Sequence, residues 1–397
     1  MSPRIAIFLA SATFVLYSIY ILNGTAESLY QWSKDLAPYE IRQHLGLSKR
    51  FLLQYGHVFF LIILLFLSRY IFRSDAPLRI SGKITQVIGK YTSAVFLIHF
   101  PILFFLAAIT HHNPNSSLDQ ILLLTGAIVL SILFGRFCFM LKPAFDAALL
   151  SLTKRLDLAY PKSKQTSEPI IALQLTRSHS EFLNLVKIIS MGAVVLGHFS
   201  FREFTHYTLP GFDGSAPRFA VPVFFMLSGY FLMLSIDRCR TGPATLLLKK
   251  YWSLYYLILP MLALVPILDA IGYGIDPTIY WFDDYYVFER ERGPLGMPIF
   301  FATVINSVLY LNEIWIYNLM GLSDMKGGIV AFSNDPYWFM CYLLSYTLLM
   351  IVWRMVSGIR RYILTALICL VIGPPVLLLA PLFFAGGLTY LLHKRLE

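Results

Sequence analysis

Charged residues are scarce in this 397-residue chain, where Asp, Glu, Lys and Arg together make up only 14%. Soluble domains carry about a quarter of such residues, so the composition excludes an ordinary soluble domain. Apolar residues reach 57%, and the mean hydropathy is +0.65. The sequence therefore predicts an integral membrane protein in contact with membrane lipid.

Cysteine is also rare, and the spacing of the few present excludes two kinds of site. Cys138, Cys239, Cys341 and Cys369 show neither metal-ligand spacing nor a disulfide framework, so we expect packing residues. The chain has no glycine-rich phosphate loop and no Cys/His cluster. Its net charge of +10 is spread between apolar segments, which is typical of membrane topology. We therefore expect no metal cofactor and no nucleic-acid partner.

Long apolar runs are abundant, and each predicts a transmembrane helix because lipid leaves no partner for an unpaired backbone. The predicted fold class is all-α, a polytopic membrane helix bundle of about ten transmembrane helices. The last two candidates are separated by Gly373-Pro374-Pro375 and could form one broken helix, so the total is nine or ten. The candidates lie near residues 5–22, 52–72, 91–110, 119–141, 186–203, 219–236, 251–270, 335–353, 361–374 and 375–392.

Positive charge predicts the orientation of these helices. Lys and Arg cluster between the second and third candidates and again between the fourth and fifth, so these loops should be cytoplasmic, as should both termini. Residues 297–322 are apolar enough to cross, but a crossing would place Arg354, Arg360 and Arg361 outside. We therefore predict an external segment that lies on the interface or re-enters the membrane.

A polar stretch divides the chain into two parts. It runs from Leu141 to Glu181 and contains Pro, Lys and Ser in close succession. We predict a four-helix part over residues 1–150, a cytoplasmic linker over 151–181 and a six-helix part over 182–397. Together the two parts should form one membrane domain.

Two ionisable residues stand on one face of the fifth candidate helix. Lys187 and His198 are eleven residues apart, which is almost three whole helical turns and roughly 16 Å along the axis. Ionisable groups inside membrane helices are costly and usually face a polar cavity, so His198 is a candidate functional residue. The alternative is a buried histidine bonded to a neighbouring carbonyl.

The motifs of the second part resemble those of membrane-bound acyltransferase family 3, whose members O-acylate cell-surface sugars and lipids. Leu-Asn-Leu-Val-Lys at 183–187, followed by His198, is similar to the family's opening motif, with Lys187 in place of Arg. Phe-Phe-Met-Leu-Ser-Gly at 224–229 looks like its Phe-Phe-x-x-Ser-Gly segment. Further likenesses lie at 248–260, at Pro336-Tyr-Trp-Phe339, and at 381–386.

The order of the motifs suggests a circular permutation of that family's fold. Residues 88–101, which contain His99, and residues 139–145 resemble segments near the family's C-terminus, yet here they come first. On this hypothesis residues 1–150 correspond to the family's last helices and 182–397 to its first. The alternative is a fusion of two truncated domains, each of which would expose an unburied bundle face.

The resemblance implies an acyl-CoA-dependent O-acyltransferase of the bacterial inner membrane, moving an acetyl or other short acyl group to a glycan or glycolipid hydroxyl. His198 would be the general base, and His99 the second catalytic candidate, orienting His198 or contacting the acceptor. Alternatively, the His99 ring caps a carbonyl that Pro101 frees. The oligomeric state stays open, with a homodimer as one option.

The same resemblance suggests roles for residues near the two membrane surfaces. Lys187, Lys249 and Lys250 would meet the phosphates of acetyl-CoA or another acyl-CoA; for Lys249 and Lys250, snorkelling is an equal alternative. Ser228 would contact substrate or serve a helix contact, and Trp338 would bind the sugar or belong to an interfacial aromatic belt. Rival functions are a transporter with His198 as proton relay, or a non-catalytic relative.

Overall fold

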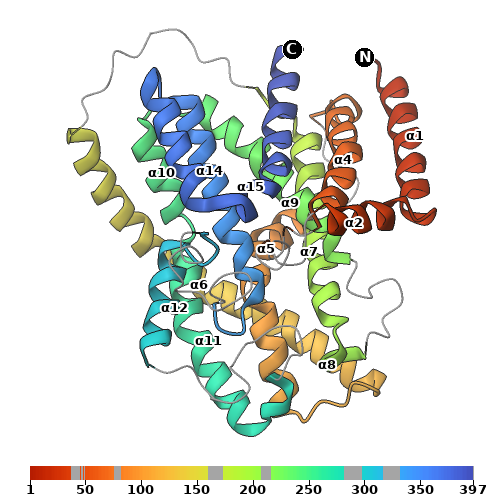
Figure 1. Cartoon of the computed structure of the whole chain (residues 1–397), viewed down its shortest axis with the longest axis vertical. Helices are drawn as coiled ribbons and strands as arrows, with labels where there is room; N and C mark the ends of the chain where they lie inside the picture. Colours follow the sequence, from red (N-terminus) through yellow and green to blue (C-terminus); the bar gives the residue numbers. More distant parts are fainter. Residues whose placement is uncertain are drawn as a thin grey trace.

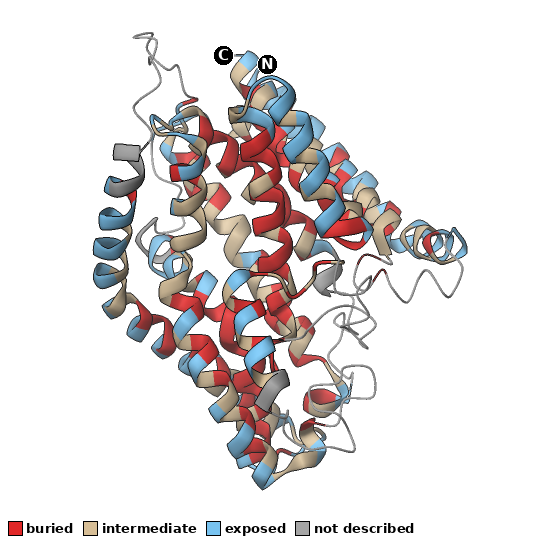
Figure 2. Ribbon diagram, turned by 60° about the vertical axis from the view of Figure 1, so that its left-hand side comes forward, coloured by how far each residue is buried: buried red, intermediate tan, exposed pale blue. Residues whose placement is uncertain are grey.

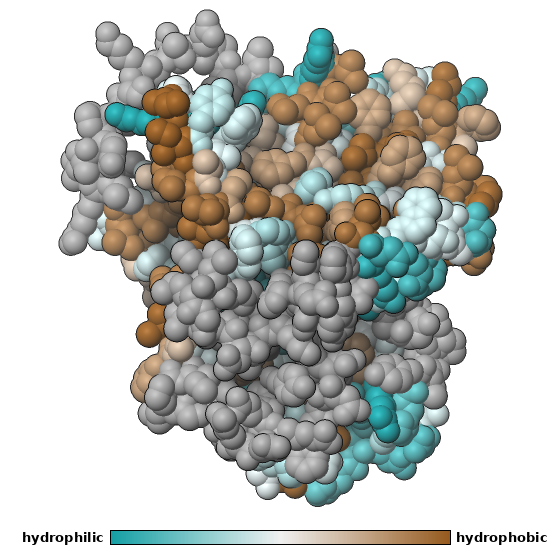
Figure 3. All heavy atoms as spheres, in the orientation of Figure 1, coloured by the Kyte–Doolittle hydropathy of each residue, from teal (hydrophilic) through white to brown (hydrophobic). Residues whose placement is uncertain are grey.

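The computed structural model describes residues 1–36, 45, 48, 50–75, 82–159, 173–206, 216–280, 297–315 and 331–396. These residues form helices joined by turns and short irregular segments, and the β-structure among them is one isolated bridge between Ala331 and Asn334. Nine of the described helices are long and apolar enough to cross a membrane, which confirms the predicted fold class. Figure 3 shows apolar side chains gathered over the upper half of the molecule.

The first part of the chain supplies α1, α2, α4, α5 and α6. Their bounds are Pro3–Leu22, Thr25–Asp35, Phe51–Ile71, Gly82–Ile109 and Ser117–Ala159. The second part supplies the remaining helices, of which α8, α10 and α12 are short. Their bounds are Arg177–Phe199 (α7), Arg202–Thr205 (α8), Ala216–Asp237 (α9), Pro243–Trp252 (α10), Tyr255–Ile275 (α11), Met297–Leu309 (α12), Trp338–Met355 (α14) and Ile359–Arg395 (α15).

Helix α15 is broken inside, as the Gly373-Pro374-Pro375 sequence predicts. Gly373 has a φ of 71° and a ψ of 178°, which is a non-helical conformation that favours glycine. A Cβ atom at Gly373 would lie 2.3 Å from the Cβ atom of Trp315. The two final candidate spans are therefore the halves of one long helix that changes direction (Figure 1).

Two segments differ in detail from the sequence prediction. Helix α6 continues through Ala159, so residues 151–159, which we expected to be linker, are helical. The start of the 297–322 segment forms α12, whose 13 residues are shorter than the roughly 20 needed to cross a bilayer. Residues 316–322 lie outside the described ranges. The interfacial position of this segment stays a prediction.

Helices from the two parts of the chain interleave. Helix α5 packs against α6, α7 and α11, and α4 packs against α1, α9 and α15. One continuous apolar core contains buried residues of both parts, such as Phe104 and Phe383, and Figure 2 shows buried residues concentrated in the middle of the bundle. Both termini lie at the same end of the molecule (Figure 1).

Hydrogen bonds join the start of α7 to the chain that follows α4. The Thr176 hydroxyl donates to the carbonyl oxygen of Phe72 at 2.7 Å, and its oxygen caps α7 by accepting the His179 N–H at 3.4 Å. The Ser178 hydroxyl donates to the Ser74 carbonyl oxygen at 2.6 Å. The beginning of the second part is thus fixed against the first part.

Helices α9 and α15 approach each other at the level of their backbones. A Cβ atom at Gly229 would lie 1.9 Å from the Phe383 carbonyl oxygen, and one at Gly386 would lie 1.8 Å from the Met226 carbonyl oxygen. Small residues permit such close packing, which is a main source of helix association in membranes. Gly229 therefore serves a helix contact, the structural role considered for the Ser228-Gly229 pair.

We predict that Gly229→Ala destabilises the folded protein by about 1–3 kcal/mol, because α9 and α15 must separate to admit the methyl group. Thermal unfolding of purified protein in detergent measures the effect. Gly192→Ala on α7 is the matched control, since an added Cβ there would have no neighbour within 4 Å. Equal unfolding temperatures for the two variants would contradict this account of the packing.

Candidate functional site

His99 and His198 meet between α5 and α7. The His99 Nε2 atom lies 2.9 Å from the His198 Nδ1 atom, and the two rings are stacked with centroids 5.1 Å apart. His99 is fully buried, whereas His198 is partly exposed. The structure thus brings together the two histidines that the sequence selected as candidate catalytic residues.

Backbone carbonyls determine which nitrogen of each neutral ring carries its proton. The His99 Nδ1 atom lies 2.9 Å from the Val95 carbonyl oxygen and 3.0 Å from that of Phe96. Carbonyl oxygens only accept hydrogen bonds, so His99 Nδ1 carries the proton and His99 Nε2 has a lone pair. His99 Nε2 then accepts the N–H of His198 Nδ1. The His198 Nε2 atom is left with its lone pair, as a base requires.

Pro101 has the predicted local effect, but the freed carbonyl has a different partner. A proline lacks an N–H, so the Leu97 carbonyl four residues earlier loses its helical donor. Asn334 Nδ2 donates to that Leu97 oxygen at 2.7 Å, while the His99 ring contacts the carbonyls of the two residues before Leu97. The His99 ring is therefore not the cap of the carbonyl that Pro101 frees.

The turn that carries Asn334 is anchored on α11. Buried Asp269 accepts the Ser333 N–H at 3.0 Å on Oδ2 and the Ser333 hydroxyl at 2.5 Å on Oδ1. Asp269 was not among the residues predicted from the sequence, although an acidic residue inside a predicted span is itself a signal of a polar site. The hydrogen bonds from Ser333 to Asp269 fix the turn, and the hydrogen bond from Asn334 to the Leu97 carbonyl joins that turn to α5. Together these bonds support the turn of α5 that contains His99.

Two aromatic rings pack close to His198. The Phe100 ring centroid lies 4.8 Å from that of His198, and the Phe201 centroid lies 5.7 Å away. His198 stands one residue before the end of α7, and α8 follows at the end of the molecule away from the termini (Figure 1). An imidazole in this position has aromatic neighbours in Phe100 and Phe201 and a polar partner in His99.

The three candidate donor-binding lysines lie at different places. Lys187 Nζ donates to the Gly89 carbonyl oxygen on α5 at 3.1 Å, on the side of α7 that faces the first part of the chain. On α10, Lys250 Nζ donates to the Ser235 hydroxyl at 2.9 Å, and Lys249 is exposed. Lys187 is thus the one of the three that shares a helix with His198.

The two candidate substrate-binding residues lie on α9 and α14. Ser228 is partly exposed and precedes the close contact at Gly229. Trp338 begins α14, and its ring lies 5.1 Å from the Tyr342 ring and 6.3 Å from the Phe225 ring, centroid to centroid. Phe339 reaches the Phe96 ring on α5 at 5.2 Å, so this aromatic group adjoins the turn before His99.

Comparison with known families identifies the second part of the chain. A family model described as an acyltransferase domain, acyltransferase 3, matches residues 180–396, more than half of the chain. This protein belongs to the acyltransferase 3 family. Comparisons with curated proteins and with solved structures gave no match. The matched residues of this acyltransferase 3 protein include Lys187 and His198, whereas His99 lies outside them. The circular permutation stays a prediction.

The described residues form no cluster of side chains that could bind a metal ion. Within them, no group of three His, Cys, Asp or Glu side chains is arranged to hold a metal ion. The candidate site of this acyltransferase 3 protein contains two imidazoles, backbone carbonyls and the supporting residues Asp269, Ser333 and Asn334.

We predict that Asp269→Leu destabilises the protein by about 1–3 kcal/mol, because the buried N–H and hydroxyl of Ser333 lose their acceptors. Thermal unfolding in detergent measures the change. Ser333→Ala alone should cost less, since the residue keeps its N–H bond to Asp269, and the double variant should match Asp269→Leu. Strictly additive losses would show that the two side chains act independently.

Proposed function

We propose that this protein is an integral membrane O-acyltransferase that moves an acetyl or short acyl group from acyl-CoA to a hydroxyl of a cell-surface glycan or glycolipid. The observation that carries the proposal is the His99–His198 hydrogen bond, which leaves a lone pair on His198 Nε2. Membership in the acyltransferase 3 family supports the reaction class.

In the proposed reaction, His198 Nε2 takes the proton of the acceptor hydroxyl as that oxygen attacks the thioester carbonyl carbon. The tetrahedral intermediate then collapses, and the carbon–sulfur bond breaks. The imidazolium returns its proton to the departing coenzyme A thiolate, so the products are an ester and a free thiol. His99 acts as a positioning residue, because its lone pair holds His198 Nδ1–H and stabilises the imidazolium.

The placement of the lysines supports a donor that enters from the end opposite His198. Lys187 lies eleven residues before His198, roughly 16 Å along the same helix, and a flexible pantetheine arm can cover that distance. A cation at Lys187 would attract the donor's phosphates, with exposed Lys249 as a further contact. No metal is required for these steps.

The acceptor would approach at the His198 end of α7, which α8 follows. Trp338 and Ser228 are the candidate contacts for a sugar, since an indole ring stacks on sugar faces and a hydroxyl can donate a hydrogen bond. Positive charge in the loops favours cytoplasmic termini, and the proposed location is the bacterial inner membrane. The protein would act as a monomer or a homodimer.

We predict that His198→Ala lowers the turnover number by about 10²- to 10⁴-fold, because the base is lost while the donor site stays intact. Release of coenzyme A by purified protein, with acetyl-CoA and candidate glycans, measures the rate. His111→Asn is the matched control, since His111 is exposed and Asn tolerates its positive φ. Equal turnover by His198→Ala and the native protein would refute the mechanism.

We predict that His99→Leu lowers the turnover number with little change in KM, because His198 loses the acceptor that fixes its tautomer. His99→Gln should recover part of the activity, since an amide oxygen can accept the His198 Nδ1–H. The separate kcat and KM values for acetyl-CoA test this. Equal losses in both variants, or a loss confined to KM, would contradict a positioning role.

A transporter function predicts a different result from the same preparations. Protein reconstituted in vesicles would then move a solute or protons in a His198-dependent manner without consuming acetyl-CoA. Coenzyme A release that depends on both His198 and an added hydroxyl acceptor distinguishes the acyltransferase from the transporter.

A further inference from the structure

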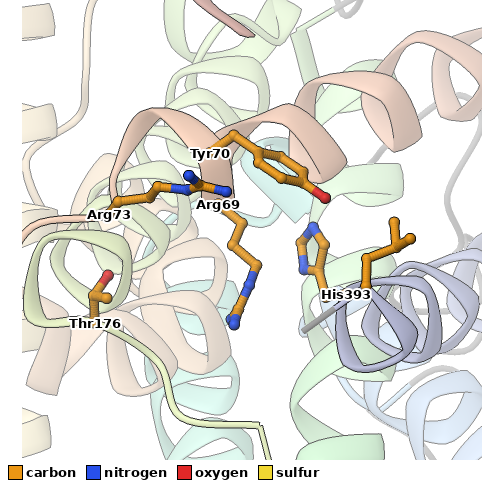
Figure 4. Close-up of a pocket in the computed structure, with 6 residues that line it drawn as sticks. Arg69, Tyr70, Arg73, Thr176 and His393 are labelled. Atoms are coloured by element: carbon orange, nitrogen blue, oxygen red, sulfur yellow. The ribbon is translucent and has the colours of Figure 1, made fainter. Parts of the chain in front are cut away.

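A basic pocket lies at the end of the molecule where both termini are found. Its volume is about 240 Å³, and it is formed between the ends of α4 and α15 and the residue before α7. Figure 4 shows Arg69 and Tyr70 on α4 and Arg73 just after the end of that helix, with His393 of α15 opposite them. Thr176 and Leu396 complete the lining.

The two arginines differ in how firmly they are held. Arg69 is partly buried and its Nη1 atom lies 3.5 Å from the Gln174 carbonyl oxygen. Arg73 is exposed, and its guanidinium lies 4.9 Å from the centre of the Tyr70 ring. The His393 nitrogens are already bonded to the Phe66 carbonyl oxygen and the Tyr230 hydroxyl, both at 3.0 Å. The pocket's positive charge therefore comes from the two guanidinium groups.

A second, apolar groove lies along the same pair of helices. Its volume is about 580 Å³. It is lined by one residue of α4 and a series from the second half of α15, namely Ile62, Leu377, Ala380, Pro381, Phe384, Ala385 and Leu388.

Helical spacing places the groove and the pocket on one continuous surface. Ile62 and Arg69 are seven residues apart on α4, which is about two turns, so both face the same side. Ala385 on α15 and Leu396, the residue that caps the end of α15, are eleven residues apart, which is about three turns. The surface between α4 and α15, which we call the seam, thus has an apolar groove along the helices and a positively charged pocket at one end.

We infer that this seam binds an anionic phospholipid, with its phosphate against Arg69 and Arg73 and an acyl chain in the apolar groove. Basic pockets between membrane helices are suited to lipid head groups, and the groove offers apolar surface to a chain. Guanidinium groups match the geometry of a phosphate. The inference does not depend on the proposed acyltransferase reaction.

The acyl donor is a weaker candidate for this pocket. Thr176 in the lining is 22 residues before His198, or roughly 33 Å along α7, which is about twice the distance from Lys187. A donor whose thioester is at His198 therefore fits the level of Lys187 better than the level of Arg73. The apolar groove next to the pocket offers no polar groups to bind the nucleotide part of coenzyme A.

The head-group part of the inference is tested by native mass spectrometry of the purified full chain in detergent. Dioleoylphosphatidylglycerol should bind more tightly than dioleoylphosphatidylcholine, which has the same chains and no net charge. Arg73→Gln should weaken binding of the anionic lipid about fivefold, the change that about 1 kcal/mol produces. Arg360→Gln, which removes an exposed arginine outside the pocket, should leave it unchanged.

The groove is tested with a pair of alanine substitutions on α15. Ala380→Leu fills the groove and should weaken binding of dioleoylphosphatidylglycerol but not of dihexanoylphosphatidylglycerol, whose short chains do not need the groove. Ala366→Leu, at an exposed position in the first half of α15, should affect neither lipid.

Three results would overturn the inference. The first is equal affinity for the anionic and the zwitterionic lipid, and the second is equal behaviour of Arg73→Gln and Arg360→Gln. The third is weaker binding of coenzyme A in Arg73→Gln with unchanged binding of the lipid, which would assign the pocket to the donor's phosphates. Loss of coenzyme A release in His198→Ala with intact lipid binding would leave the inference standing.

Discussion

The His99–His198 hydrogen bond is the interaction on which the site depends. It joins two helices from different parts of the chain, and its direction is determined by the carbonyls of Val95 and Phe96. Because those oxygens can only accept, the proton arrangement of both neutral rings follows without any charged partner. A membrane interior penalises ionised groups, so a base that is positioned by carbonyls and a neutral imidazole suits this environment better than one positioned by a carboxylate.

The support of this pair extends outward through a short series of polar contacts. Pro101 removes a donor from α5, Asn334 supplies the missing one, and Asp269 fixes the turn that carries Asn334. Each contact satisfies a buried group that would otherwise be costly in an apolar interior. The kink-prone turn of α5 is therefore held in a defined position, and the orientation of the His99 ring is held with it.

Much of the architecture was predictable, because the length of an apolar run is a local property of the sequence. Such patterns predicted the membrane-spanning helices and the break at Gly373. Local spacing and motif resemblance also singled out His198. The His99–His198 contact followed from motif resemblance, but its atoms and direction did not. Asp269, Ser333 and Asn334 were missed because their roles depend on distant partners, and α6 continued past residue 151 because local polarity does not end a helix.

The family match explains why neither part of the chain forms this site alone. The matched segment, residues 180–396, contains His198, but the ring that accepts its Nδ1–H comes from α5, before the match begins. The same segment contains α9 and α15, yet α15 packs against α4 of the first part. A segment without α4 and α5 would leave His198 Nδ1–H without its acceptor and one face of α15 exposed. This dependence is easier to explain with one bundle whose helices occur in a permuted order. It is harder to explain with a fusion of two independent half-domains.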